Sequence, residues 1–335
     1  QATTKFEAAL RGDRLDLDRL LLPTPEPAKG APAKAEPAAA PLDPAAFAGL
    51  SGTAALRLGT LRTKKMDLRD VVVRVRVEGD EVRFEEARLA AFGGTVSAAG
   101  THLALARPDA PFEVALDLKG VEGKDALRLV GDHDVLAGKL DAALKLGGTG
   151  WKLGLLEKSV TGGLDGILRD GAFLGKDLVA SVAGPLAAML PFAASRLPER
   201  GSTPLGKTLP FAFQIANGVA TLKKPITAQT DEGALSLQGG VRLDGTLELP
   251  ATFDLSPALV SRLTGGRAKP SEPVPVTFRI AGPAWKPRVE ALSLDAAAKA
   301  IAQQAAAGAL GRAVGVEGSS VQDVAAKKKA EAEAR

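Results

Sequence analysis

The chain has 335 residues, a net charge of +4 and only 4% aromatic residues, a length that suits one large domain or two ordinary ones. It contains no cysteine, which excludes disulfides, zinc–thiolate sites and thiol catalysis. The small charge, without basic residues interleaved among aromatic ones, argues against nucleic-acid binding. No run of about 18 apolar residues is present, so no transmembrane helix is expected.

The N-terminal part divides into two predicted segments. Residues 1–22 are expected to end a preceding strand region, because leucine and aspartate alternate from Leu15 to Asp18. Residues 23–45 are rich in proline and alanine and predict an extended, semi-stiff linker. The chain begins at Gln1 without a signal peptide, and we expect it to be the C-terminal part of a longer protein.

Residues 56–105 read as consecutive strands joined by tight turns, and the rest of the chain is organised around them. Val71, Val73 and Val75 alternate with Arg74 and Arg76, so one face is aliphatic and the other basic. Glu78-Gly79-Asp80 has the composition of a hairpin turn. The run Phe92-Gly93-Gly94 predicts a bulge or a sharp bend.

In the middle of the chain, the spacing of apolar residues changes several times between that of a strand and that of a helix. Alternation predicts strands at 112–118 and 140–146, with a short helix between them at 121–130. The glycine-rich stretch Val160–Phe173 is expected to be a strand pair. Residues 177–197 have apolar residues at helical spacing and predict the longest helix of this region. Pro185 and Pro191 should kink or segment this helix.

Strands return from Leu209, with two hairpin dipeptides, Asn217-Gly218 and Asp244-Gly245. Expected strands cover 219–222, 234–239, 241–243, 247–249 and 252–255. A short helix should follow, with Ser256 as its N-cap and Pro257 in its first turn.

The C-terminal part begins with residues 274–280, expected to be the last strand. Residues 291–316 are alanine-rich and predict a helix, and residues 317–335 a disordered, charged tail. The expected fold is therefore mainly β with minor α. It is a long, curled antiparallel sheet (a groove or open sandwich) spanning 46–290, with a few short helices and the alanine-rich C-terminal helix.

No catalytic constellation is visible. His102 lies in a strand pattern, and His133 lies between Asp132 and Asp134, where adjacent loop residues seldom converge on one ion. Gly147–Gly150 lacks the lysine of a phosphate loop and predicts a turn. We therefore expect a non-enzymatic protein that has no metal site and no cofactor.

Short strand and turn motifs recur along the chain: Asp70–Val73, Glu78–Asp80, Ala87–Gly94, Gly100–Leu103, Asp170-Gly171, Gly175–Leu178, Asn217–Val219, Leu237–Gly239, Arg242–Gly245 and Ala281–Pro283 with Pro287. In this order they resemble the C-terminal region of the AsmA-like family of bacterial envelope proteins. The family often has Leu-Asp at the position where this chain has His102-Leu103.

That resemblance implies a periplasmic protein anchored to the inner membrane by an N-terminal segment outside this sequence. Its expected role is to carry or bind phospholipid, or another acyl-chain lipid, between inner and outer membrane along an apolar β-groove, and so to influence outer-membrane assembly. Envelope proteins are further expected partners. The residues expected to line the groove are Val73, Val75, Phe84, Leu116, Leu144, Phe211, Phe213, Leu237 and Phe278.

Two alternatives stay open at the level of the sequence. The sheet could fold over itself as a sandwich and bury its apolar face. The protein would then be a structural or docking module that contacts an outer-membrane assembly protein without binding lipid. Alternation of apolar and polar residues is compatible with both.

Overall fold

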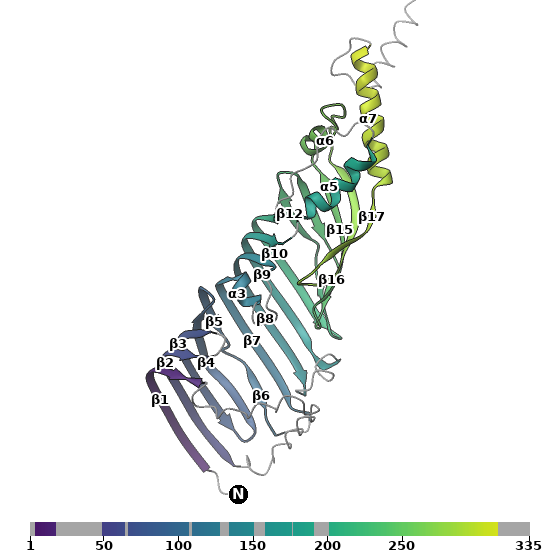
Figure 1. Ribbon diagram of the computed structural model, residues 1–335. Helices are drawn as coiled ribbons and strands as arrows, with labels where there is room; N and C mark the ends of the chain where they lie inside the picture. The colour runs from purple at the N-terminus through teal and green to yellow at the C-terminus, as the bar shows by residue number, and fades with distance from the viewer. Residues whose placement is uncertain are drawn as a thin grey trace, which may run out of the picture. The chain divides into compact units, whose positions relative to one another are not determined.

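The computed structural model describes residues 4–17, 49–63, 66–106, 109–127, 134–150, 158–175, 177–190 and 201–313. These residues form one large, mostly antiparallel sheet of 17 strands with a few helices, the last of them at the C-terminal end (Figure 1). The predicted fold class, mainly β with minor α, is confirmed. The chain divides into two compact units: unit 1 is Gln1–Asp170, Pro210–Lys224 and Val241–Asp244, and unit 2 is Gly171–Leu209, Pro225–Gly240 and Gly245–Arg335.

Unit 1 is built almost entirely of strands. They are β1 (Thr4–Asp16), β2 (Leu50–Arg62), β3 (Asp67–Glu78), β4 (Glu81–Ala91), β5 (Gly94–Ser97), β6 (His102–Ala104), β7 (Pro111–Glu122), β8 (Leu136–Thr149) and β11 (Val219–Leu222), together with the short helix α3 (Gly123–Leu127). Three strands have residues in both units: β9 (Thr161–Leu174), β10 (Ser202–Ala216) and β14 (Gly240–Arg242).

The strands of unit 1 pair mainly with their neighbours in sequence. From β2 to β8 the pairs are antiparallel, with the short strands β5 and β6 both lying between β4 and β7. The exception is β1, which pairs with β2 in parallel, Thr4 beside Leu50 and Asp16 beside Arg62. A parallel pair needs a long connection. The predicted linker, residues 23–45, lies between these strands in sequence but outside the described residues.

The predicted hairpin turns of unit 1 are confirmed. Gly79 has φ 62° and closes the turn between β3 and β4, where Glu78 pairs with Glu81. Asn217 and Gly218 both have positive φ and join β10 to β11. The run Phe92-Gly93 is a hairpin turn between β4 and β5, sharper than a bulge within one strand.

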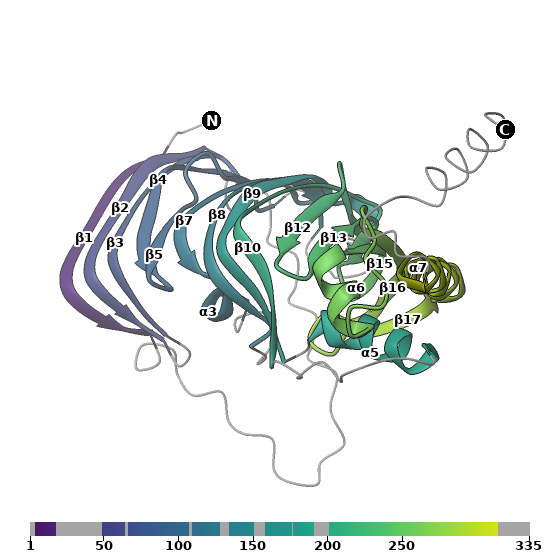
Figure 2. The same cartoon turned by 90° about the horizontal axis from the view of Figure 1, so that it is seen from above.

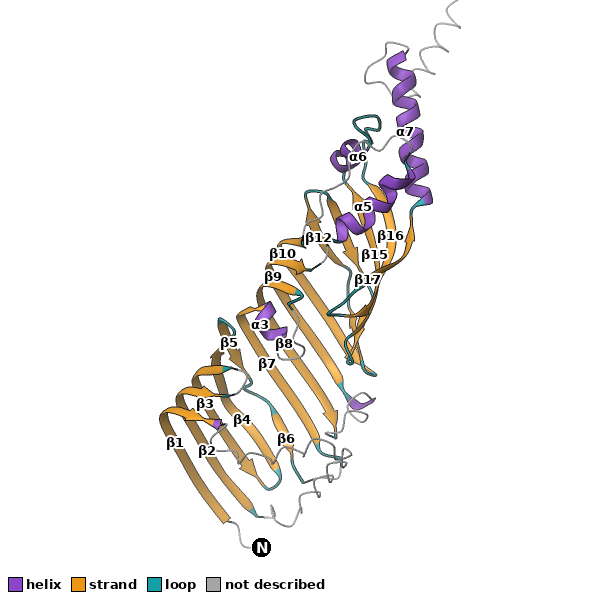
Figure 3. Cartoon of the chain, viewed as in Figure 1, coloured by secondary structure: helices purple, strands orange, loops and turns teal. Residues whose placement is uncertain are grey.

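Unit 2 combines strands with helices that cover them. Its elements are β12 (Ile226–Thr230), β13 (Gly233–Leu237), β15 (Thr246–Leu255), β16 (Val274–Pro283), β17 (Arg288–Ser293), α5 (Leu178–Met189), α6 (Pro257–Leu263) and α7 (Asp295–Ala313) (Figure 3). Helix α7 contacts β16 and α5, and α5 contacts β17. Val276 and Ile301 have no exposed surface.

Two helix starts in unit 2 follow the sequence rules. Ser256 caps α6 as predicted, accepting a hydrogen bond from the backbone N–H of Leu259 at 3.2 Å, and Pro257 is its first residue. Asp177 caps α5 in the same way, through the N–H of Ala180 at 2.9 Å. Helix α5 contains Pro185 and ends at Met189, because Leu190 is extended; residues 191–197 of the predicted helix lie outside the described residues.

The structure corrects several strand boundaries. Val160–Phe173 is not a strand pair, because Thr161–Leu174 is one long strand, β9. Its glycines do not make turns but admit close neighbours: a Cβ on Gly166 would lie 2.5 Å from Cζ of Phe211. The predicted segments 247–249 and 252–255 are one strand, β15.

Two strands escaped the sequence prediction. Strand β12 was missed, and the last strand is β17 rather than the segment 274–280, which is part of β16. Both missed strands are short. In β17 the alternation of Arg288, Val289 and Glu290 is interrupted at Ala291, which has φ 51°, and the register with β16 shifts there.

Candidate functional site

An uninterrupted apolar row crosses unit 1. Each member pairs with the next across neighbouring strands, so all of them lie on one face of the sheet. Over seven strands this row spans about 29 Å at a strand spacing of about 4.8 Å. Its members are Phe6, Gly52, Val77, Val82, Leu103, Phe112 and Gly148.

The predicted groove residues of β3, β4, β7 and β8 lie on this same face. Val75 pairs with Phe84, and Val73 lies two residues along β3 on the same side. Leu116 pairs with Leu144. All five of these side chains are only half-buried. We call this side of unit 1 the aliphatic face.

The two predicted phenylalanines of β10 extend the aliphatic face. Phe211 and Phe213 lie on one side of the strand with ring centroids 6.0 Å apart. Ile215, two residues further on, belongs to a buried cluster with Phe112 and Val160, and Leu144 packs against that cluster. The structure thus brings the predicted residues of unit 1 onto one surface.

A hollow of about 300 Å³ opens on the aliphatic face where β1, β2 and β3 lie side by side. Six of the residues that line the hollow have their side chains on the aliphatic face, as the register of β1, β2 and β3 shows. They are Ala8, Leu10, Ala54, Leu56, Val73 and Val75. Small side chains on β1 and β2 leave room between the larger ones. Figure 2 shows that the strands of unit 1 bend in the same direction.

The opposite face of the same strands is charged. Thr53, Arg76, Arg83, His102 and Glu113 follow one another in a cross-strand row directly beside the apolar one. Unit 1 is therefore an amphipathic sheet, with hydrocarbon on one side and ionic groups on the other.

Ion pairs between neighbouring side chains organise part of the charged face. Arg76 donates to Glu85 over 2.6 Å, which raises the pKa of the guanidinium further. Arg83 pairs with Glu81 at 3.2 Å. Such exposed pairs contribute little stability.

Leu237 and Phe278, the remaining predicted residues, belong to unit 2. Leu237 pairs with Ala251, and Ala251 pairs with Phe278, so the three share a face. Phe278 is 5% exposed and Val276 is fully buried, and both lie on β16, the strand that helix α7 contacts. Phe278 is therefore part of a packed core, whereas Leu237 is half-buried.

Of the two histidines, only His102 belongs to the part of the chain that the structure describes. Nδ1 of His102 lies 3.6 Å from Oε2 of Glu113, on the charged face. His133 falls outside the described residues. Among the described residues, no cluster of three histidine, aspartate or glutamate side chains is arranged to hold a metal ion.

Sequence reasoning missed part of the surface. Phe6 and Gly52 begin the apolar row, and the ring of Phe6 lies across the glycine: a Cβ there would be 2.6 Å from Cδ1 of Phe6. An aromatic residue that packs over a glycine on the neighbouring strand stabilises a sheet in this way. The signal was present as a glycine within an otherwise alternating strand, but the pairing with β1 could not be read from it.

The fold and this surface define a mainly β protein with one aliphatic and one charged face in unit 1. None of the helices in the described part of the chain has both the length and the apolar character needed to cross a bilayer. Comparison with protein-family models, curated proteins and solved structures found no match. The resemblance to the AsmA-like family stays a prediction.

Proposed function

We propose that unit 1 binds the acyl chain of a lipid along its aliphatic face, and that the protein acts without enzymatic chemistry. The observation that carries the proposal is the contrast between the two units. In unit 2, helices α7 and α5 contact β16 and β17, and Val276 and Phe278 of β16 are buried. In unit 1, Val73, Val75 and Phe84 are half-buried, with no described helix packed on them.

The dimensions of the surface suit such a ligand. Six strand residues span about 20 Å, close to the length of one extended acyl chain. Burial of each methylene contributes about 0.8 kcal/mol, so a hydrocarbon tail gains on the order of 10 kcal/mol by leaving water. The described residues that line the hollow are all aliphatic, and none of them carries a polar side chain that could fix a particular headgroup. We therefore infer selectivity for the chain rather than the headgroup at this face.

The resemblance to the AsmA-like family supports the same proposal and adds its cellular setting. In that setting the protein is periplasmic, is held at the inner membrane by a further segment, and moves phospholipid between the two membranes of the envelope. No group with the geometry of an acid, a base and a nucleophile is part of the proposal.

The test is native mass spectrometry of detergent-free protein, combined with lipid extraction. We expect phospholipid to copurify with the wild-type chain and to be lost in Ala54→Asp, which places a charge in the hollow. Thr53→Asp is the matched control, because it adds the same side chain one residue away on the charged face. It should retain lipid.

Ala54→Phe gives a second arm that adds no charge. It fills the hollow and should reduce lipid occupancy while the protein stays folded by circular dichroism. Wild-type protein that is free of lipid and takes up none from vesicles would contradict the proposal. That outcome would favour the docking module.

A further inference from the structure

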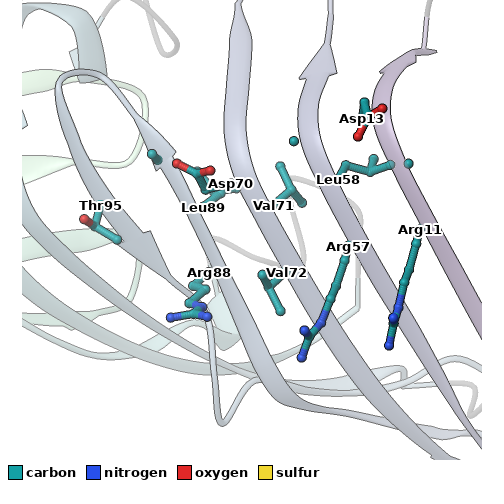
Figure 4. Close-up of a pocket in the computed structure, with 13 residues that line it drawn as sticks. Arg11, Asp13, Arg57, Leu58, Asp70, Val71, Val72, Arg88, Leu89 and Thr95 are labelled. Carbon is teal, nitrogen blue, oxygen red and sulfur yellow. The ribbon is translucent and has the colours of Figure 1, made fainter.

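A row of arginines crosses the charged face of unit 1. Arg11 pairs with Arg57, Arg57 with Val72, and Val72 with Arg88, so the three arginines occupy one line over β1, β2 and β4. They border a hollow of about 600 Å³. In Figure 4 their side chains extend toward the same side of that hollow.

Few carboxylates lie close enough to neutralise the charges of the arginine row. Arg88 lies 3.4 Å from Glu86, and 62% of its side chain is exposed. In the described part of the chain, no carboxylate lies within ion-pair distance of Arg11 or Arg57. Asp13 and Asp70 also line the hollow, but Figure 4 places them on the side away from the guanidinium groups. Like charges on directly facing strand positions repel, so this arrangement does not serve stability.

The spacing of the row suits phosphate. A guanidinium group presents a planar fork of donors that matches two phosphate oxygens. Arg11 and Arg57 lie on adjacent strands, about 4.8 Å apart, and can hold one phosphate together. Arg88 lies two strands beyond Arg57, about 10 Å away, and can reach a second.

We propose that Arg11, Arg57 and Arg88 form a binding site for phosphate anions. A surface that presents several phosphates, such as a layer of anionic phospholipid headgroups, would engage all three residues. A single free phosphate would engage only the Arg11–Arg57 pair. This site is independent of the proposed acyl-chain surface, because Arg57 lies between Leu56 and Leu58, whose side chains are on the opposite face.

The test measures cosedimentation of the full chain with vesicles of phosphatidylglycerol and phosphatidylcholine, against vesicles of phosphatidylcholine alone. We expect binding to the anionic vesicles, weakened when the salt concentration is raised. The double variant Arg11→Gln/Arg57→Gln should lower the apparent affinity by about tenfold or more. Lys139→Gln/Lys145→Gln removes the same charge from β8 and should change the affinity less than about twofold.

A second arm identifies the source of the phosphate. Isothermal titration with inorganic phosphate should give weak binding that the arginine variant abolishes; such binding without vesicle binding would assign the site to free phosphate. Loss of vesicle affinity that is equal in the arginine and lysine variants would overturn the proposal, because net charge alone would explain it. Absence of binding in both arms would overturn it as well. Thermal unfolding of each variant confirms that it folds.

Discussion

At the residue scale, glycines in unit 1 decide how closely neighbouring strands and side chains approach. Gly166 of β9 lies under Phe211 of β10, and a Cβ at this position would be 2.5 Å from Cζ of the ring and 2.7 Å from the backbone oxygen of Asp141. The Asp141 oxygen cannot yield easily, because it belongs to the backbone of β8. The contact explains why a glycine interrupts an otherwise apolar strand.

Gly166→Ala should therefore destabilise the protein by about 1–3 kcal/mol, the usual cost of overpacking. Denaturant unfolding followed by circular dichroism measures the change. Gly201→Ala is the control, since a Cβ at this exposed position meets no atom within 4 Å and its φ is not positive. It should leave stability unchanged or raise it slightly, because alanine reduces the conformational freedom of the unfolded chain. A neutral Gly166→Ala would contradict the packing described for Phe211.

Asp141 holds a bulge in β7. Its Oδ1 accepts a hydrogen bond from the backbone N–H of Gly120 at 2.6 Å, where Gly120 has φ 63°, and its Oδ2 pairs with Arg169. The hydrogen bond from Gly120 is the main cause that lowers the pKa of Asp141, and Arg169 adds to it. The charged form is therefore the one that stabilises the fold.

A pH dependence follows from the lowered pKa of Asp141. The carboxylate contributes its full stabilisation above its unfolded pKa of about 3.9, and the contribution is lost as the pH falls through the lower pKa of the folded state. Asp141→Asn should lower the Tm at pH 7 by about 1–2 °C. The difference from wild type should shrink toward pH 3. Calorimetry at both pH values tests this, and an equal difference at both would contradict the role of the charge.

At the scale of elements, α7 shows how little apolar surface a helix needs in order to dock. The helix is mostly alanine, yet Ala297, Ile301 and Ala305 recur every four residues and are all buried. They form one narrow stripe, and α7 contacts β16 and α5. The composition predicted the helix itself, whereas its docking depended on a sheet surface that composition does not describe.

Ile301→Ala should remove most of that anchor and cost about 2–5 kcal/mol. The loss should appear as faster hydrogen exchange in α7, measured by mass spectrometry. Gln304→Ala, on the exposed side of the same helix, is the control and should leave exchange in α7 unchanged. Equal exchange in wild type and Ile301→Ala would mean that the helix is held by its other contacts.

At the scale of the whole molecule, the two units use the same strand pattern in different ways. Valines and leucines alternate with polar residues in both. In unit 2 helices and strands bury the apolar positions, whereas in unit 1 most of them stay half-buried.

The same substitution should therefore cost less in unit 1. Val276→Ala, at a position with no exposed surface, should lower the free energy of unfolding by about 2–3 kcal/mol. Val75→Ala, on the aliphatic face, should lower it by about half as much. Denaturant unfolding of lipid-free protein compares the two, and equal costs would mean that the aliphatic face of unit 1 is as well packed as the core of unit 2.

The sequence by itself determined the strand-rich fold, the hairpins at Gly79 and Asn217-Gly218, the cap at Ser256 and the aliphatic side of β3. These features depend on local chemistry: alternation, positive φ and a side-chain acceptor at a helix start. The local pattern gave a wrong prediction at 160–173, where glycines such as Gly166 make room for neighbouring groups and do not form turns.

Only the tertiary structure decided which apolar side chains are covered. It buried Phe278 in unit 2, left Val75 and Phe84 half-buried in unit 1, and aligned Arg11 with Arg57 on the opposite face. The physical reason is that register joins residues that are far apart in the chain. Alternation tells which side chains share a side of their own strand, but not which strands lie beside it or what packs on top.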